Sequence, residues 1–337
     1  MIEAKGFNTT YGRGLLPDLV QQLGSYAVVT HPEPWQYIQA SLVHRPDAVI
    51  AAGSLAPDHL EHLVATLPAV DAVIGIGGGS AMDTAKWLHW RRGLPLYQVP
   101  SLPSVNACFT RMTALRDAGG VRYEGDAVPE AVLVDFELIG SADPALVRGG
   151  IGDVLSCHTA RHDWQLAAQA GIGYEWDEAA AAMSLTYLDE LEALAPLLAD
   201  GQDEGLRRLM ECHRDIGWRC HDLGHARFEE GSEHFFAYTF EEVTGRTIMH
   251  GELVSLGVLI MSALQGNDPE RPRRITDASK MRTGLSELGV TWAEIETSLL
   301  RMPTFVEEQQ LWYSAANGLT VDELALDTAR AALRVED

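Results

Sequence analysis

The chain has 337 residues, of which 46% are hydrophobic and 22% charged, a composition typical of a globular protein with a large core and room for two domains. Its net charge of −23 argues against nucleic acid and anionic membranes as partners, because too few cations are present to offset repulsion from phosphate groups. Four cysteines without Cys-x-x-Cys spacing, no apolar leader and no apolar run of roughly 18 residues predict a cytoplasmic protein that makes no contact with a membrane.

The first 140 residues alternate short apolar runs with helical patterns. Continuous apolar runs are typical of parallel strands that are covered on both faces, and the segments between them carry apolar residues at helical intervals. The alternation predicts a Rossmann-like, doubly wound α/β sheet. The expected strands are 25–30, 47–51, 71–76, 95–100 and 131–135, and the expected helices are 35–42, 59–67 and 81–91.

The strand signal disappears after about residue 143. Helical patterns separated by Gly, Pro and Asp breaks occupy the rest of the chain. We therefore expect an α/β domain over residues 1–142 and an all-helical domain over residues 143–337. The expected helices of the second domain are 144–169, 178–198, 204–223, 232–243, 251–265, 275–288 and 291–302.

A glycine-rich segment follows the third expected strand. Gly77, Gly78, Gly79 and Ser80 lead directly into a helical pattern. Glycines let backbone amides approach a pyrophosphate, and the positive end of the following helix attracts its charge. A tight turn between strand and helix would also explain three glycines, but the strand–loop–helix context favours a loop that binds nucleotide phosphates.

Three polar residues stand beside glycines, and the two histidines among them lie near expected helix starts. Asp153 follows Gly-Gly-Ile-Gly, His234 ends Gly-Ser-Glu-His, and His250 begins His-Gly-Glu. One carboxylate and two imidazoles form a three-ligand site for a divalent metal and leave coordination positions open for a substrate oxygen. His213 and His221 could mimic a metal pattern, but we interpret them as part of a solvated helix face.

These motifs resemble the iron-containing alcohol dehydrogenase superfamily, in the branch that holds glycerol dehydrogenase and sn-glycerol-1-phosphate dehydrogenase. The resemblance covers nearly the whole chain and implies the dehydroquinate synthase-like fold, with an NAD(P)-binding domain followed by a helical domain that binds metal and substrate. The segments that carry it are 11–14, 77–86, 100–104, 149–153, 163–164, 231–234, 250–252, 312–314 and 318–320.

The resemblance also implies roles for single residues. It assigns one zinc, iron or nickel ion to Asp153, His234 and His250. The cofactor is NAD or NADP, and His31 after the first expected strand leaves the choice open, because no aspartate stands there to exclude a 2′-phosphate. We expect a small-molecule substrate and a homo-oligomer, a dimer or larger. The cofactor contacts implied are Gly77, Gly78, Gly79, Ser80, Asp83, Ser101, Ser104 and Thr110.

Two candidate catalytic residues depart from the family pattern. Asn106 stands where the family has a substrate-contacting aspartate, and Tyr238 stands where glycerol-1-phosphate dehydrogenases have a substrate-contacting histidine. Asn cannot act as a base, and Tyr keeps a hydroxyl donor while it removes a partner for phosphate. Glu229 and Glu230 add two carboxylates just before the first metal histidine, which would oppose a phosphorylated substrate.

The implied reaction is hydride transfer between NAD(P)H and a ketone or aldehyde with a neighbouring hydroxyl, which interconverts a small polyol or alcohol and its hydroxyketone or hydroxyaldehyde. An alternative is sn-glycerol-1-phosphate dehydrogenase, which reduces dihydroxyacetone phosphate. A sugar-phosphate cyclase, a lyase similar to dehydroquinate synthase, shares the fold, but the lysine-rich substrate loop of that class is not visible at 106–113. A catalytically silent binding protein is the remaining alternative.

Overall fold

The computed structural model describes residues 6–103, 106–117 and 120–335. The chain divides into two compact units, each described by itself below. Unit 1 is Met1–Val147 with His213–Asp222, and unit 2 is Arg148–Cys212 with Leu223–Asp337. The domain boundary that the sequence suggests after residue 142 stays a prediction.

Unit 1 contains a parallel sheet of six strands in the order β1-β8-β5-β4-β2-β3. The order reverses direction between β2 and β4, and ligands of open α/β sheets bind beside the carboxyl ends of the strands at such a point. A separate antiparallel hairpin, β6–β7, follows β5 in the chain. The elements of this part of the chain are β1 (Thr9–Gly12), α1 (Leu15–Gln22), β2 (Tyr26–Thr30), α2 (Pro32–Ile38), β3 (Ala48–Ala51), α3 (Pro57–Thr66), β4 (Ala72–Gly77), α4 (Gly79–Arg92), β5 (Leu96–Pro100), the 3-10 helix η1 (Asn106–Phe109), β6 (Thr113–Asp117), β7 (Gly120–Glu124), β8 (Ala131–Asp135), α5 (Phe136–Gly140) and α6 (Pro144–Arg148).

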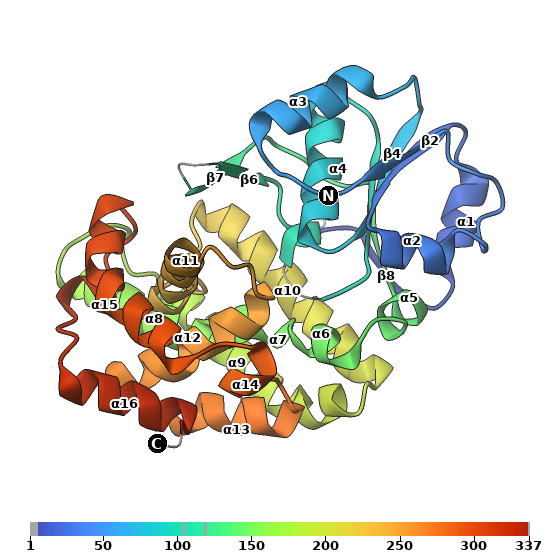
Figure 1. Ribbon diagram of the computed structural model, residues 1–337. Coiled ribbons are helices and arrows are strands. Elements are labelled where there is room, and N and C mark those ends of the chain that lie inside the picture. Colours follow the sequence, from blue (N-terminus) through green and yellow to red (C-terminus); the bar gives the residue numbers. More distant parts are fainter. Residues whose placement is uncertain (1–5, 104–105, 118–119, 336–337) are drawn as a thin grey trace. The chain divides into compact units, whose positions relative to one another are not determined.

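Helices cover both faces of this sheet (Figure 1). On one face, Val20 of α1, Ile38 of α2 and Leu138 of α5 join a buried cluster with side chains of β2 and β4. On the other face, Leu60 of α3 and Trp87 of α4 form a second cluster with Leu115 of β6. Burial on both faces explains why the central strands are continuously apolar.

Unit 2 is helical, and among the described residues no strand follows β8. Its central helix is α12, whose residues from Gly251 to Ser262 are all buried, as expected of a helix that is apolar on every side. Helices α7, α11, α13 and α16 pack against α12. The elements are α7 (Ile151–Leu155), α8 (Cys157–Gln169), α9 (Glu178–Ala199), α10 (Asp203–Leu223, shared with unit 1), α11 (Ser232–Thr244), α12 (His250–Leu264), α13 (Glu270–Ser279), α14 (Leu285–Leu288), α15 (Trp292–Glu308), η2 (Ala315–Gly318) and α16 (Glu323–Leu333).

The predicted fold class is confirmed, with differences in single elements. The helix expected at 35–42 begins earlier, because Pro32 occupies its first position. The helix expected at 144–169 is three helices, α6, α7 and α8, and the first break falls at Gly149 and Gly150. The strand β1, the hairpin β6–β7 and the helices α1 and α16 were not predicted. Within the described ranges, no helix has the length and apolar character needed to cross a bilayer.

Candidate metal centre and nucleotide loop

The glycine-rich loop joins β4 to α4 at the reversal point of the sheet. Gly77 has a φ of 156°, and a Cβ there would lie 2.8 Å from the Ala81 Cβ and 3.2 Å from the His31 ring. Helix α4 begins at Gly79 without a side-chain cap on its first amides. Backbone amides at such a helix start are ready to bind an anion.

Neighbouring strands bring two further groups to this loop. The His31 Nε2 lies 3.0 Å from the Ser80 Oγ, and burial lowers the pKa of His31, so its imidazole is mainly neutral near pH 7. The Ser101 amide donates to the Gly77 carbonyl over 2.9 Å. The structure thus brings together Ser80, Gly77 and Ser101, three of the residues implied to contact the cofactor.

Asp83 and Thr110 meet through a buried lysine that the sequence did not single out for a role. The Lys86 ammonium lies 2.6 Å from the Asp83 carboxylate and donates to the Thr110 hydroxyl and to the Met112 carbonyl over 2.9 and 2.6 Å. Asp83 is 5% exposed and Lys86 1%. Burial raises the pKa of the Asp83 carboxyl, against the charge of Lys86. The pair fastens α4 to the segment after η1, and cofactor contact by Asp83 or Thr110 stays a prediction.

The remaining predicted residues are Asn106, Tyr238 and Ser104. Asn106 begins the 3-10 helix η1 in unit 1 and is partly buried. Tyr238, the other predicted catalytic residue that departs from the family pattern, belongs to unit 2. Contact of either side chain with a substrate stays a prediction. Ser104 lies outside the described residues.

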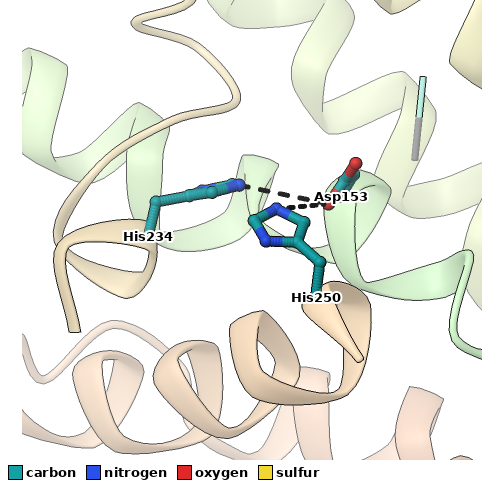
Figure 2. Close-up of side chains that lie close together, drawn as sticks. All are labelled: Asp153, His234 and His250. Carbon is teal, nitrogen blue, oxygen red and sulfur yellow. Dashed lines mark ion pairs between the residues drawn. The ribbon is translucent and has the colours of Figure 1, made fainter. Parts of the chain in front are cut away.

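Asp153, His234 and His250 point toward one another in unit 2 (Figure 2). The Asp153 Oδ1 lies 3.5 Å from the His250 Nε2 and 4.0 Å from the His234 Nε2, and one ligand atom from each residue falls within 4.8 Å of the others. Asp153 and His234 are buried, whereas the His250 side chain is 25% exposed. One carboxylate and two imidazoles at this separation are a donor set that fits a divalent zinc, iron or nickel ion. Among the residues described, no other such group of His, Cys, Asp and Glu was found.

Glycines allow the helices that carry these ligands to approach closely. A Cβ on Gly251, next to His250, would lie 1.8 Å from the Gly149 carbonyl oxygen. A Cβ on Gly152, next to Asp153, would lie 2.3 Å from the Gly251 carbonyl oxygen. Side chains at these positions would push α7 and α12 apart and separate Asp153 from His250.

Glu233 determines which nitrogen of His234 faces the other candidate ligands. Its carboxylate lies 2.8 Å from the His234 Nδ1, so Nδ1 carries a proton, and Nε2 faces Asp153 and would offer its lone pair to a metal that displaces the Nε2 proton. Burial alone would lower the pKa of His234, but the hydrogen bond and charge of Glu233, with the charges of Glu230 and Asp153, raise it to about 10. The surroundings of His234 therefore favour positive charge, which a bound metal would supply.

Tyr238 lies one helical turn after His234, with their ring centroids 6.2 Å apart. Its hydroxyl donates to the Glu230 carboxylate over 2.9 Å. Arg227 belongs to the same loop as Glu230, but its guanidinium donates to the Tyr313 carbonyl over 2.6 Å and is only 2% exposed. Tyr238 and its partner Glu230 therefore stand near His234, whereas a hydrogen bond ties Arg227 to Tyr313.

The structure corrects one interpretation and adds residues that the sequence did not reveal. The interpretation of His213 as part of a solvated face is wrong, because His213 is completely buried in α10. From the sequence, no role was assigned to Glu233 or Lys86. A signal was available for Glu233, since a carboxylate next to a metal histidine is a common partner of its second nitrogen.

The chain is also similar in sequence to known proteins. Residues 36–143 match the family described as iron-containing alcohol dehydrogenase. A glycerol-1-phosphate dehydrogenase [NAD(P)+] from Hyperthermus butylicus is 28% identical over 320 residues, which are 91% of this chain and 90% of the relative. The enzyme of the same name from Sulfurisphaera tokodaii is 31% identical over 226 residues, which are 66% of this chain and 63% of the relative.

Solved structures share the fold. Glycerol dehydrogenase from Schizosaccharomyces pombe superimposes with a TM-score of 0.71 at 20% identity and covers 98% of this chain and 89% of its own. An iron-containing alcohol dehydrogenase from Corynebacterium glutamicum superimposes with a TM-score of 0.69 at 18% identity, over 99% of this chain and 97% of its own. At these identities the likeness concerns the fold.

Proposed function

This chain belongs to the iron-containing alcohol dehydrogenase superfamily, and we propose on that premise that it is a metal-dependent NAD(P)H oxidoreductase that interconverts a small polyol or alcohol and its hydroxyketone or hydroxyaldehyde. The observation that carries the proposal is the converging set of Asp153, His234 and His250, a carboxylate and two imidazoles that leave coordination positions open. The glycine loop at the sheet reversal supports the nucleotide half of the proposal.

We assign the following roles to residues of unit 2. Asp153, His234 and His250 would hold the metal, which polarises a substrate carbonyl when it is bound. Glu233 keeps the Nδ1 of His234 protonated, so that its other nitrogen remains a ligand. Tyr238 would offer its hydroxyl, fixed by Glu230, to a substrate oxygen near His234. The nicotinamide would supply or accept the hydride.

The charges around His234 favour a substrate without a phosphate group. Glu230 raises the pKa of His234 through its negative charge, which means that this charge acts at the site. Two unit charges about 4 Å apart repel by about 4 kcal/mol at an effective dielectric of 20. Arg227 of the same loop donates to the Tyr313 carbonyl, and the charges of Glu230 and Glu233 act on its guanidinium, so it offsets only part of this negative charge. We therefore favour a neutral hydroxyketone or hydroxyaldehyde.

sn-Glycerol-1-phosphate dehydrogenase is the second candidate. The observation that favours it is the printed name of the two relatives above, one of which aligns with 90% of its length. In that case the substrate of reduction would be dihydroxyacetone phosphate, and the carboxylates near His234 would have to lie apart from its phosphate.

Steady-state kinetics can decide between the candidates. Reduction of dihydroxyacetone and of dihydroxyacetone phosphate should be followed with NADH and with NADPH, with zinc or nickel added in turn. We expect a higher kcat/KM for dihydroxyacetone. A clear preference for the phosphate would establish the second candidate instead. Turnover of a sugar phosphate without net change in NADH would indicate a cyclase, and a protein that binds metal but turns over nothing would indicate a binding role.

The remaining parts of the proposal concern the setting of the enzyme. We propose that it acts in the cytoplasm, with NAD or NADP and one zinc, iron or nickel ion, and that it forms a dimer or larger homo-oligomer. Light scattering coupled to size exclusion tests the assembly, and metal analysis of protein purified without chelators tests the identity of the ion.

A further inference from the structure

The turn that carries the first candidate metal histidine lies directly on helix α8. A Cβ on Gly231 would lie 2.8 Å from the Ala160 Cα and 2.7 Å from an Asp163 carboxylate oxygen, so only glycine fits there without displacement. The turn continues through Ser232 and Glu233 to His234, and each of these residues is buried. The position of His234 therefore depends on how this turn is held against α8.

Two side chains of α8, one helical turn apart, hold the turn. The Thr159 hydroxyl donates to Glu233 over 2.7 Å, and Glu233 in turn accepts from the Gly231 amide over 2.7 Å and from His234. The Asp163 carboxylate accepts from the Ser232 amide over 2.7 Å. Thr159 therefore contacts the turn through the side chain of Glu233, whereas Asp163 accepts a hydrogen bond from the backbone of the turn directly.

The second oxygen of Asp163 has donors of its own. It accepts from the Ala315 amide over 2.7 Å and from the Gln265 side chain over 3.1 Å. Gln265 also donates to the Ser232 hydroxyl over 3.2 Å. Asp163 is 0% exposed, so no water competes for its oxygens. Both oxygens must act as acceptors, one toward the turn and the other toward the first residue of η2.

From this arrangement we propose that Asp163 is a positioning residue for the metal centre, which fixes the backbone of Ser232 and thereby the reach of His234 toward the metal. This inference rests on the proposed function only in that Asp153, His234 and His250 bind a metal. The Ala315 amide, which donates to Asp163, would then also help to hold the metal centre, although the segment around Ala315 supplies no ligand.

The isosteric variant Asp163→Asn tests the proposal. An asparagine amide has one acceptor and one donor, so its NH₂ group must face either the Ser232 amide or the Ala315 amide, and both are donors. The metal-free protein should be titrated with Co²⁺ by calorimetry and by visible absorption, which reports the ligand geometry. We expect the Kd for Co²⁺ to rise about 10- to 100-fold and the absorption spectrum to change.

Asp177→Asn is the matched control, because Asp177 also accepts from two backbone amides, at the start of α9, Ala179 and Ala180. Both amides bond to the same Asp177 oxygen, which asparagine retains, so this variant should leave the urea midpoint, the Kd and the spectrum nearly unchanged. A wild-type Kd and spectrum in Asp163→Asn would overturn the proposal, and so would equal losses of affinity in both variants. If His250→Ala binds Co²⁺ with the wild-type Kd, the proposed function itself would be overturned.

A second variant covers the case in which Asp163→Asn does not fold. Gln265→Met removes the side-chain amide that donates to Asp163 and to the Ser232 hydroxyl, and it leaves Asp163 and the backbone of the turn in place. Methionine is close to glutamine in length and carries no donor. We expect a weaker Co²⁺ complex with an altered spectrum here too, with a smaller change than in Asp163→Asn, and an unchanged complex would overturn the proposal.

Discussion

His250 is the most accessible of the three candidate ligands and stands at the first position of α12. Its side chain is 25% exposed, against 6% for that of Asp153. Loss of this imidazole should therefore disturb the packing of unit 2 little, so that its effect on metal binding can be measured in a folded protein. His234 is less suited to this test, because its ring is buried beside Glu233.

His250→Ala should reduce bound metal and activity together, and the free energy of unfolding of the metal-free protein should change by less than about 1 kcal/mol, as is usual for partly exposed positions. Metal analysis, steady-state rates and urea unfolding check the three quantities. Stoichiometric metal at wild-type affinity in this variant would show that His250 is not a ligand.

At the scale of elements, the contact between α7 and α12 sets the distance between Asp153 and His250. Gly251→Ala places a methyl group within 1.8 Å of the original position of the Gly149 carbonyl oxygen, so the helices must separate. We expect a loss of about 1–3 kcal/mol in unfolding free energy and a weaker Co²⁺ complex. Gly140→Ala, where a Cβ has open space, is the control. Unaltered stability and metal affinity in Gly251→Ala would contradict the role of this contact.

The start of α4 carries the corresponding prediction for the nucleotide. A β-branched side chain at Gly78 would occupy the space that a pyrophosphate needs next to the amides of α4. Gly78→Val should weaken NAD(P)H binding at least tenfold while metal content stays unchanged, because the metal residues belong to unit 2. Fluorescence titration measures the affinity, with Gly140→Val as the control. Wild-type affinity would exclude the loop as the phosphate site.

The elements differ in how well the sequence predicts them. Strand β4 and helix α12 were predicted to within two residues, because their burial makes them continuously apolar over a length that fits one kind of element only. The breaks between α6, α7 and α8 were not predicted, since Gly149 and Gly150 look like tolerated glycines in a helical pattern. Motifs in the sequence predicted that Asp153, His234 and His250 lie together. The hydrogen bonds of Asp163 and Lys86 join residues that are 69 and 24 positions apart in the chain, and no local pattern encodes such contacts.

For the molecule as a whole, the net charge of −23 is the property with the widest effect. Mutual repulsion of the excess carboxylates opposes the compact state. The melting temperature should therefore rise by a few degrees when NaCl is raised from about 0.01 M to about 0.15 M, because the screening length falls from about 30 Å to about 8 Å.

This measurement requires protein in EDTA, so that metal binding does not contribute, and KCl should give the same result as NaCl. A lower melting temperature at higher salt would mean that attractive ion pairs, such as Arg271 with Asp189 and Glu192, outweigh the repulsion.

Both imidazoles of the candidate metal centre come from the first turns of long helices, α11 and α12. The aligned peptide dipoles of each helix act like about half a positive charge at this end. Two such ends, added to a divalent ion, would draw electron density from any hydroxyl oxygen held between them. The helix ends would offset part of the negative charge that Asp153, Glu230 and Glu233 place around His234, so a polyol hydroxyl bound there would release its proton more readily than in the same site without them. The backbone of α11 and α12 would in this way assist alcohol oxidation without contributing a ligand or a base.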